Sequence, residues 1–246
     1  MLTLAVINQK GGVGKTTTAY EFAYGIQMYR HTSAASGRSV GGMLLLDGDS
    51  QGNLTLATVG RDTEGMHIAG EKSTKPYAAR RDLGITRIDC ADVEDTGEQA
   101  DLSYHPAEAI DYRIIDCPPA LNKRTLGFLM DADEVIIPCN ADVFSLTGLS
   151  DLLDTIKVIK KQANKKLKVA GILITSFNPR TKVGQIFCQR IEDIKERYKV
   201  PLFETTIRNS VLVREAQALK LPVQAYKKNA PVAQDYEVAV KEYLHI

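Results

Sequence analysis

The sequence lacks a long hydrophobic run and lacks the features of a secretory leader. No stretch of about eighteen consecutive apolar residues occurs in the 246 residues, so we expect no helix that crosses a membrane. The chain starts with MLTLAVIN, which has neither a basic segment nor a small-residue cleavage site. We therefore expect a protein that stays in the cytoplasm.

Cysteine is scarce and scattered. The four cysteines include no CxxC pair, and the four histidines are equally isolated, so the usual zinc-site spacings are missing. This pattern is typical of reduced thiols in a cytosolic protein. A pair of cysteines that ligates an iron–sulfur cluster between subunits stays open as an alternative. The four are Cys90, Cys117, Cys139 and Cys188.

Acidic residues are absent from one long stretch, Thr155 to Ile191. The net charge of +1 hides a strong imbalance along the chain. Residues 1–154 carry 13 basic and 22 acidic side chains, whereas residues 155–228 carry 17 basic and 5 acidic ones. The lysines are either solvated side chains that balance an acidic half, or a basic face for a polyanion such as DNA.

Short apolar runs alternate with helix-length segments along the chain. This alternation predicts an α/β fold, a doubly wound and mostly parallel sheet with helices on both faces, and a single domain over residues 1–246. The expected strands are 2–8, 43–47, 112–117, 134–139 and 169–177, with 201–207 as a candidate sixth. The expected helices are 15–30, 122–131, 145–164, 183–198, 210–219 and 232–244. We expect a surface loop at 31–42 and assign nothing to 60–111.

The segment NQKGGVGKTTT follows the first strand and opens a helix. Backbone N–H groups at such a position can hold phosphates, and the glycines let the backbone come close. Lys15 would reach the β and γ phosphates of a nucleotide, and the Thr16 hydroxyl would ligate Mg²⁺. The expected nucleotide-binding residues of the loop are Gly11, Gly12, Val13, Gly14, Lys15, Thr16 and Thr17.

The ordinary phosphate-loop pattern needs a glycine where this chain has Gln9. The loop instead reads K-G-G-V-G-K-T, the deviant Walker A sequence, and with it the chain resembles the ParA/MinD family of P-loop ATPases. In that family the early lysine, Lys10 here, acts on the phosphates bound by a second copy of the chain. A positive charge delivered in this way stabilises phosphoryl transfer. The resemblance thus implies ATP and Mg²⁺ as cofactors, an ATP-bound homodimer, and Lys10 and Lys15 as catalytic residues.

Two further segments resemble the family's carboxylate motifs. LLLDGDSQGNLT is similar to D-x-D-P-Q-G-N, with Ser50 in place of proline, and YRIIDCPPAL is similar to a Walker B strand. The resemblance implies that Asp49 positions the attacking water and that residues 51–53 form a switch that senses the γ-phosphate. It also implies that Asp47 and Asp116, with Thr16, hold Mg²⁺, the aspartates through water. Asp47 and Asp49 as simple turn formers remain the alternative.

The base pocket is expected after a later strand. LITSFNPRT resembles the Asn-Pro version found in the MinD branch, which implies that Asn178 reads the base edge. TTIRNSVLVREAQALKLPV resembles the segment whose backbone lines adenine, here near Ile207 to Asn209. Lys220 in this segment stands at or near the family's usual glycine.

The missing features separate the branches of the family. The C-terminal segment places Ala233, Tyr236, Val240 and Tyr243 on one helix face but has few basic residues, so we expect a packed helix and no membrane binding. The sequence also begins at the phosphate-loop strand, and we expect no N-terminal helix-turn-helix domain.

The closest resemblance is to the ParA branch, which acts in plasmid or chromosome partition. It implies non-specific DNA binding on the nucleoid and slow ATP hydrolysis that a ParB-like centromere-binding partner stimulates. A MinD-like or cargo-positioning ATPase and an iron–sulfur ATPase are the alternatives. Arg208 and Arg214 could instead pair with acids near the dimer seam. The candidate DNA-binding residues are Lys182, Arg190, Arg208, Arg214 and Lys220, with the lysines of KVIKKQANKKLK.

Overall fold

The computed structural model describes residues 1–33, 42–49, 51–58, 77–80, 85–89, 110–142 and 145–246. Strands within these residues form one sheet in the order β3-β4-β2-β5-β1-β6-β7, in which only β3 runs antiparallel to its neighbour. The predicted doubly wound, mostly parallel sheet is therefore confirmed. The strands are β1 (Leu2–Val6), β2 (Gly42–Asp47), β3 (Tyr77–Arg80), β4 (Ile85–Asp89), β5 (Ile110–Asp116), β6 (Glu134–Asn140) and β7 (Lys168–Thr175).

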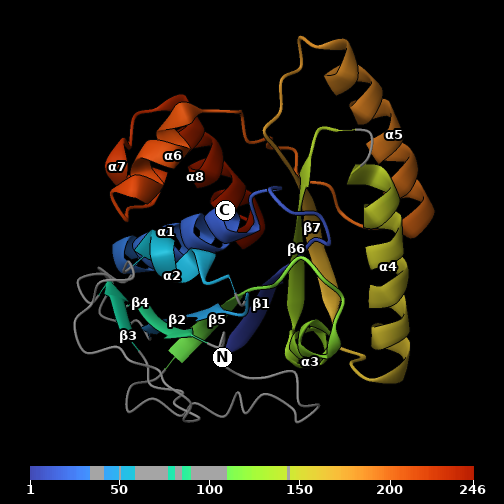
Figure 1. The fold of residues 1–246 in the computed structure, drawn as a ribbon, viewed down its shortest axis with the longest axis horizontal. Coiled ribbons are helices and arrows are strands. Elements are labelled where there is room, and N and C mark those ends of the chain that lie inside the picture. The colour runs from blue at the N-terminus through green and yellow to red at the C-terminus, as the bar shows by residue number, and fades with distance from the viewer. Residues whose placement is uncertain (34–41, 50, 59–76, 81–84, 90–109, 143–144) are drawn as a thin grey trace.

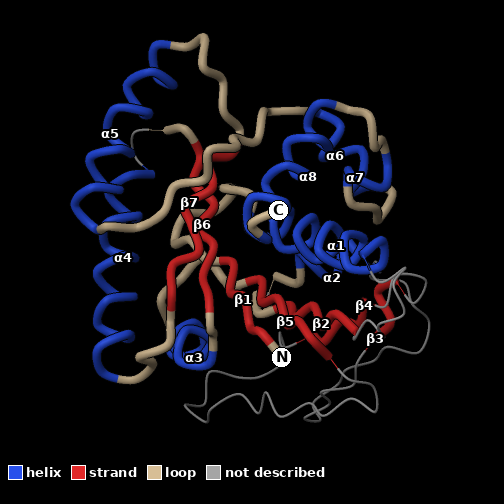
Figure 2. Tube along the Cα trace, turned by 180° about the vertical axis from the view of Figure 1, so that it is seen from behind, coloured by secondary structure: helices blue, strands red, loops and turns tan. Residues whose placement is uncertain are grey.

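Helices cover both faces of the sheet (Figures 1 and 2). α3, α4 and α5 pack on one face, while α1, α6, α7 and α8 pack on the other. Successive side chains of a strand point to opposite faces, so both faces are apolar. Ala5 belongs to the core under α3, α4 and α5, whereas Leu4 and Val6 belong to the core under α1, α6, α7 and α8. The helices are α1 (Lys15–Ser33), α2 (Asn53–Thr58), α3 (Lys123–Asp131), α4 (Ser145–Gln162), α5 (Lys182–Tyr198), α6 (Val211–Ala218), α7 (Val223–Tyr226) and α8 (Pro231–Leu244).

The register of the strands brings the sequence motifs to one edge of the sheet. Val6, the last residue of β1, pairs with Asp116 at the end of β5, and Asp47 at the end of β2 pairs with the same aspartate. The phosphate loop follows β1, so the loop and both aspartates lie at the carboxyl ends of neighbouring parallel strands. Open α/β sheets bind ligands at this edge.

The candidate strand at 201–207 is wrong. This segment pairs with β7 only at separate points: Leu202 forms an isolated bridge with Ile172, and the N–H groups of Phe203 and Ile207 donate to Ile172 O and Ile174 O. The N–H groups of Glu204 and Thr205 donate to the Glu242 carboxylate, at 2.6 and 3.1 Å, and not to β7. A side chain of α8 thus binds the N–H groups between Phe203 and Ile207, where the pairing with β7 is interrupted.

Other predicted boundaries moved by a few residues. Both ends of the expected loop at 31–42 are regular structure, because α1 continues to Ser33 and β2 begins at Gly42; residues 34–41 lie outside the described residues. The short helices α2 and α7 were not predicted, and β3 and β4 lie in the segment that we left unassigned. None of the helices in the described ranges is long and apolar enough to span a membrane.

Candidate phosphate-binding site

The loop between β1 and α1 needs glycine at two of its positions. Gly12 has a φ of 73° and Gly14 a φ of 85°, in the left-handed region that residues with a Cβ rarely adopt. Gly11 has a negative φ, and a Cβ added there would meet nothing within 4 Å. The left-handed backbone conformation therefore explains two of the three glycines in K-G-G-V-G-K-T, Gly12 and Gly14. The third, Gly11, lies beside open space.

Two polar residues at the ends of neighbouring strands hold the loop. Asn140, at the end of β6, donates to the carbonyl oxygen of Gly12 at 3.3 Å. The hydroxyl of Thr175, at the end of β7, donates to the carbonyl oxygen of Val13 at 2.9 Å. Sequence reasoning missed both residues. Their signal was a polar residue that closes an otherwise apolar strand.

Lys15 is buried beside two carboxylates. Its side chain extends along the loop and donates from Nζ to the carbonyl oxygen of Lys10 at 3.0 Å. Burial lowers the pKa of Lys15, and the negative charges of Asp116 and Asp49 act against that lowering. An ammonium group held in this way would gain from an anion placed at the mouth of the loop.

Asp116 and Thr16 form a pair at the bottom of the site. The Thr16 hydroxyl donates to Asp116 Oδ2 at 2.7 Å, while Asp116 Oδ1 is buried without a hydrogen-bond partner among the described residues. Burial is the largest cause that raises the pKa of Asp116 to about 8, and the negative charges of Asp47 and Asp49 add to it. A divalent cation would supply the missing partner of Oδ1 and stabilise the ionised carboxylate, so these residues fit Mg²⁺.

Asp47 and Asp49 both shape the turn after β2. Asp47 Oδ2 accepts from the backbone N–H and the hydroxyl of Thr55, at 2.8 and 2.5 Å, and so fixes the start of α2. Asp49 Oδ1 accepts from the N–H of Gln51 at 3.0 Å. The turn-forming role is therefore present for both residues. It leaves the other Asp49 oxygen for further chemistry, because no hydrogen bond to that oxygen is formed within the described residues.

Lys10 points away from its own loop toward the start of α4. Its Nζ contacts the Asp142 carboxylate and lies 3.1 Å from the Ser145 hydroxyl. The side chain is 35% exposed, in contrast to the buried Lys15. The two lysines of the loop thus have different surroundings within one chain.

The residues expected to read the base lie near one another, with one correction. Phe177 N–H donates to Ile207 O at 3.0 Å, which joins the segment that carries Asn178 to the segment that carries Asn209. Both asparagines are exposed. Ile207, however, is buried, and its N–H donates to Ile174 O at 2.8 Å. Both of its backbone groups are engaged inside the protein, so we no longer expect them to bind the base.

α1 is tied to the C-terminal helices close to the phosphate loop. Gln217 of α6 donates to the Thr17 hydroxyl at 2.9 Å. Glu21 is buried and accepts from the backbone N–H of Val223 and from Nε2 of Gln224, at 2.5 and 3.0 Å. Burial raises the pKa of Glu21 to about 7 despite these hydrogen bonds. Sequence reasoning missed Glu21 and Gln217, because partners some 200 residues apart leave no local signal.

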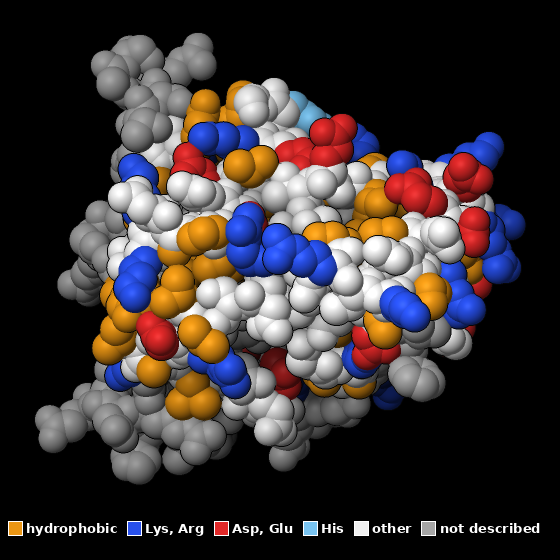
Figure 3. Space-filling model, turned by 90° about the horizontal axis from the view of Figure 1, so that it is seen from above, with side chains coloured by type: hydrophobic (Ala, Val, Ile, Leu, Met, Phe, Trp, Pro, Cys, Tyr) orange, Lys and Arg blue, Asp and Glu red, His pale blue; other side chains and the backbone are white. Residues whose placement is uncertain are grey.

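The basic residues proposed for DNA do not form one cluster. Lys182 and Arg190 lie on α5, whereas Arg214 lies on α6, which covers the opposite face of the sheet. Arg208 contacts Asp235 of the same chain through two hydrogen bonds of 2.7 Å. Lys220 is exposed. Figure 3 looks onto the end of the molecule that carries the phosphate loop, and its basic side chains are scattered among hydrophobic, acidic and neutral ones.

Two of the three cysteines in the described residues are buried inside the chain. Cys117 and Cys139 are fully buried, and burial raises the pKa of both thiols. Cys188 is partly exposed on α5, and Cys90 lies outside the described residues. In the described ranges no three His, Cys, Asp or Glu side chains are grouped so that they could hold a metal ion.

Known proteins resemble this chain along most of its length. Residues 1–69 and 104–169 match the AAA domain family. The chain is 30% identical to the chromosome partitioning protein ParA of Caulobacter vibrioides, over 98% of this chain and 93% of that protein. It is 31% identical to the chromosome-partitioning ATPase Soj of Treponema pallidum, over 98% and 96% of the two chains.

Solved structures share the fold. Apo McdA from Cyanothece superposes with a TM-score of 0.77 at 19% identity, over 99% of both chains. Cobyrinic acid a,c-diamide synthase from Mycobacterium smegmatis, with an ATP analogue and magnesium bound, superposes with a TM-score of 0.71 at 26% identity, over 100% of this chain and 94% of that one. Together with the sequence matches, these findings show that the chain belongs to the ParA/Soj family of chromosome-partitioning ATPases.

Proposed function

We propose that this chain is a partition ATPase that works as an ATP-bound dimer on DNA. Residues 1–246 would act as one ATPase domain, and two copies would enclose ATP and Mg²⁺ between their phosphate loops. The dimer would hold DNA of any sequence and so coat the nucleoid. A ParB-like protein bound at a centromere site would stimulate slow hydrolysis and release the dimer.

The observation that carries the proposal is the group beside the loop formed by the buried Lys15 and Asp116 and the half-buried Thr16. The Lys15 ammonium group would offset charge on the β and γ phosphates, and the loop N–H groups would donate hydrogen bonds to the phosphate oxygens. Thr16 and Asp116, with Asp47 behind them, would hold Mg²⁺, which neutralises charge on the phosphate oxygens when bound. The ATP analogue and magnesium of the mycobacterial structural neighbour support this assignment.

Asp49 would orient the water that attacks the γ-phosphate. Asp49 is 7% exposed, and its negative charge acts against the lowering of the Lys15 pKa by burial. One oxygen accepts from Gln51 N–H, so a change in the 51–53 segment would move the carboxylate. This coupling supports a switch at residues 51–53 that responds to the γ-phosphate.

Lys10 would act in the second subunit. In the single chain it contacts Asp142 and Ser145, and the side chain stays partly exposed. On dimerisation Lys10 would exchange this contact for the partner's nucleotide, where its charge stabilises the transferred phosphoryl group. Because the exchange is favourable only when a triphosphate is present, it would make dimerisation depend on ATP.

Asn178 and Asn209 would contact the adenine base from the surface next to β7. Their amide groups are exposed and lie on two segments joined by the Phe177–Ile207 hydrogen bond. This arrangement supports base contacts from side chains in place of the Ile207 backbone.

The test of the dimer is Lys10→Ala. We expect this variant to bind ATP but to remain a monomer with ATP and Mg²⁺, with turnover at least about tenfold below wild type. Light scattering with ATP and with ADP measures the first effect, and phosphate release measures the second. Lys123→Ala, which removes an exposed lysine at the start of α3, is the matched control. Wild-type turnover in Lys10→Ala would refute the role of Lys10 in the partner.

A further inference from the structure

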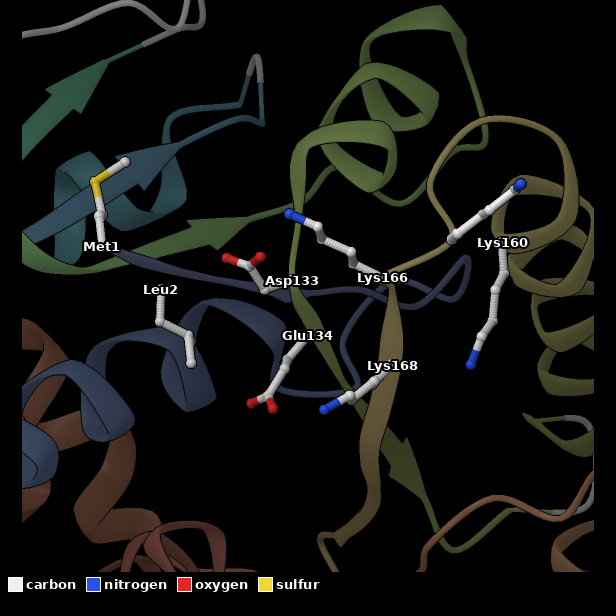
Figure 4. Close-up of a pocket in the computed structure, with 8 residues that line it drawn as sticks. Met1, Leu2, Asp133, Glu134, Lys160, Lys166 and Lys168 are labelled. Atoms are coloured by element: carbon white, nitrogen blue, oxygen red, sulfur yellow. The ribbon is translucent and has the colours of Figure 1, made fainter.

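A second group of charged side chains lies at the end of the sheet opposite the phosphate loop. Four lysines there line a hollow of about 490 Å³, together with Met1, Leu2, Asp133 and Glu134 (Figure 4). The lysines come from the last turn of α4, from the loop that follows it and from the start of β7. We call them the lysine patch: Lys160, Lys165, Lys166 and Lys168.

The acidic side chains of this hollow are bonded to neutral groups. Asp133 Oδ2 accepts from the backbone N–H of Thr3 at 2.8 Å, and Glu134 Oε2 accepts from the Tyr243 hydroxyl at 2.8 Å. Within the part of the chain that the structure describes, no lysine of the patch forms an ion pair with a carboxylate. All four lysines are exposed. The hollow therefore holds four lysines against two carboxylates, and it keeps a net positive charge.

The backbone that carries the patch is fixed. Asn164 Nδ2 donates to the carbonyl oxygens of Leu129 and Ala132, at 3.1 and 2.6 Å, which ties the loop to the end of α3. Leu167 is fully buried between two patch lysines in sequence, and the N–H of Lys166 donates to Asn164 Oδ1 at 3.2 Å. The lysines thus project from a rigid frame, so a ligand would order their side chains without ordering the loop.

We propose that the lysine patch binds the phosphodiester backbone of double-stranded DNA. Ammonium groups are compact point charges that contact phosphates without reading bases, and such contacts suit a protein that binds any sequence. The inference rests on the proposed function, which requires DNA binding, and it names the surface. It assigns the contact to lysines of the KVIKKQANKKLK segment and not to the scattered residues on α5 and α6.

The position of the patch separates DNA binding from hydrolysis. β7 begins at Lys168 in the patch and ends at Thr175, which contacts the phosphate loop. At the rise of a parallel strand, these two residues lie about 23 Å apart. DNA on the patch would therefore leave the nucleotide untouched, and loss of the patch should leave ATP turnover as it is.

The test replaces all four patch lysines by glutamine. Binding of a fluorescent mixed-sequence duplex is measured by anisotropy with ATP and Mg²⁺ over a series of salt concentrations. We expect the affinity to fall at least about tenfold, and the slope of log K against log salt to become shallower by roughly 0.9 for each lysine that contacts a phosphate. The control removes the same charge elsewhere, with glutamine at Lys123, Lys199, Lys227 and Lys228, which are exposed. ATP turnover of both variants should equal that of wild type.

The outcomes distinguish the patch from the proposed function. If wild type binds DNA and the patch variant keeps the wild-type affinity and slope, the patch assignment is wrong and the proposed function stands. A control variant that loses as much affinity as the patch variant would also overturn the assignment, because net charge alone would then explain binding. If wild type binds no duplex with any nucleotide, both the patch and the DNA part of the function fail.

Discussion

The charged side chains Lys15 and Asp116 at one end of the sheet are buried, whereas the lysine patch at the other end is exposed. At the carboxyl ends of the strands, Lys15 and Asp116 are buried and bonded to other groups of the site. At the amino ends, Lys166 and Lys168 are exposed and form no ion pair within the described residues. The same strands therefore carry a closed, polar site at one edge and an open, positive surface at the other.

This difference follows from the cost of removing charge from water. A buried charge needs partners and shifts in pKa without them, as the raised pKa of Asp116 shows. Such a site has a fixed geometry, and any change to it alters chemistry or stability. An exposed lysine keeps its hydration, contributes little to stability and acts on polyanions through its field. Variants at the two ends should thus change different quantities.

The largest expected effect is on hydrolysis, from Asp49→Ala at the closed end. Loss of the carboxylate that positions water should lower turnover by about a hundredfold or more, while ATP binding persists because Lys15 is unchanged. The ATP dimer should then accumulate and stay longer on DNA. Phosphate release and duplex dissociation rates measure the two effects.

Two further variants separate the charge of Asp49 from its place in the turn. Asp49→Asn keeps an oxygen that can accept from Gln51 N–H, so it should fold like wild type and still lose turnover. Asp193→Ala, at an exposed position of α5, should leave turnover as it is. Rapid hydrolysis in Asp49→Ala would remove this residue from the mechanism.

The second effect concerns the support of the loop. Thr175→Val keeps the shape of a buried side chain but removes the hydroxyl, which lies 2.9 Å from Val13 O and 2.8 Å from Asn140 Oδ1 and can donate to either. We expect a loss of about 1–3 kcal/mol in the free energy of unfolding, with weaker ATP binding, because the loop carbonyl is left without its partner. Urea unfolding and nucleotide titration measure these effects. Thr155→Val, on the exposed side of α4, should stay within about 0.5 kcal/mol of wild type.

Much of the closed end could be predicted from the sequence. β1 and β6 were predicted within two residues at each end, because strands buried on both faces are continuous apolar runs. The phosphate loop was found because its glycines and Lys15 follow one another in the chain. Asp116 was placed because it ends such an apolar run.

The rest depends on contacts between distant segments. Asn140 and Thr175 reach the loop only through the register of β6 and β7, which no local pattern fixes. The 201–207 segment has the composition of a strand, and only the distant Glu242 shows why it is not one. In the sequence the lysine patch appeared only as a charge imbalance. That its four lysines line one hollow could be seen only from the folded structure.

The next prediction concerns Glu21, a second buried carboxyl group near the phosphate loop whose pKa is raised. Glu21 has a pKa raised by burial from 4.5 to about 7. The folded state therefore holds this proton more tightly than the unfolded state does. The contribution of Glu21 to stability is fully present below pH 4.5 and is lost as the pH rises through about 7.

Glu21→Gln should remove this dependence. Relative to wild type, its free energy of unfolding should fall less steeply between pH 4.5 and 7, by at most about 1.4 kcal/mol per pH unit. Urea unfolding at several pH values measures the slope. Asp116 titrates in both proteins and cancels in the difference. Glu192→Gln, at an exposed position, should leave the slope unchanged. A wild-type slope in Glu21→Gln would show that folding does not raise the pKa of Glu21.

The smallest expected effect is that of Lys220→Gly. Lys220 has a φ of 59°, a left-handed conformation at the end of α6 in which glycine is favoured. Relief of this strain exceeds the larger freedom of glycine in the unfolded chain, so we expect a gain of a few tenths of a kcal/mol up to about 1 kcal/mol. Lys228→Gly, where φ is not positive, should be slightly destabilising in the same urea unfolding measurement. Because Lys220 lies outside the lysine patch, Lys220→Gly should also keep the wild-type salt slope for DNA. A shallower slope would mean that both ends of the molecule contact DNA, and the contrast between a closed chemical end and an open DNA-binding end would then be wrong.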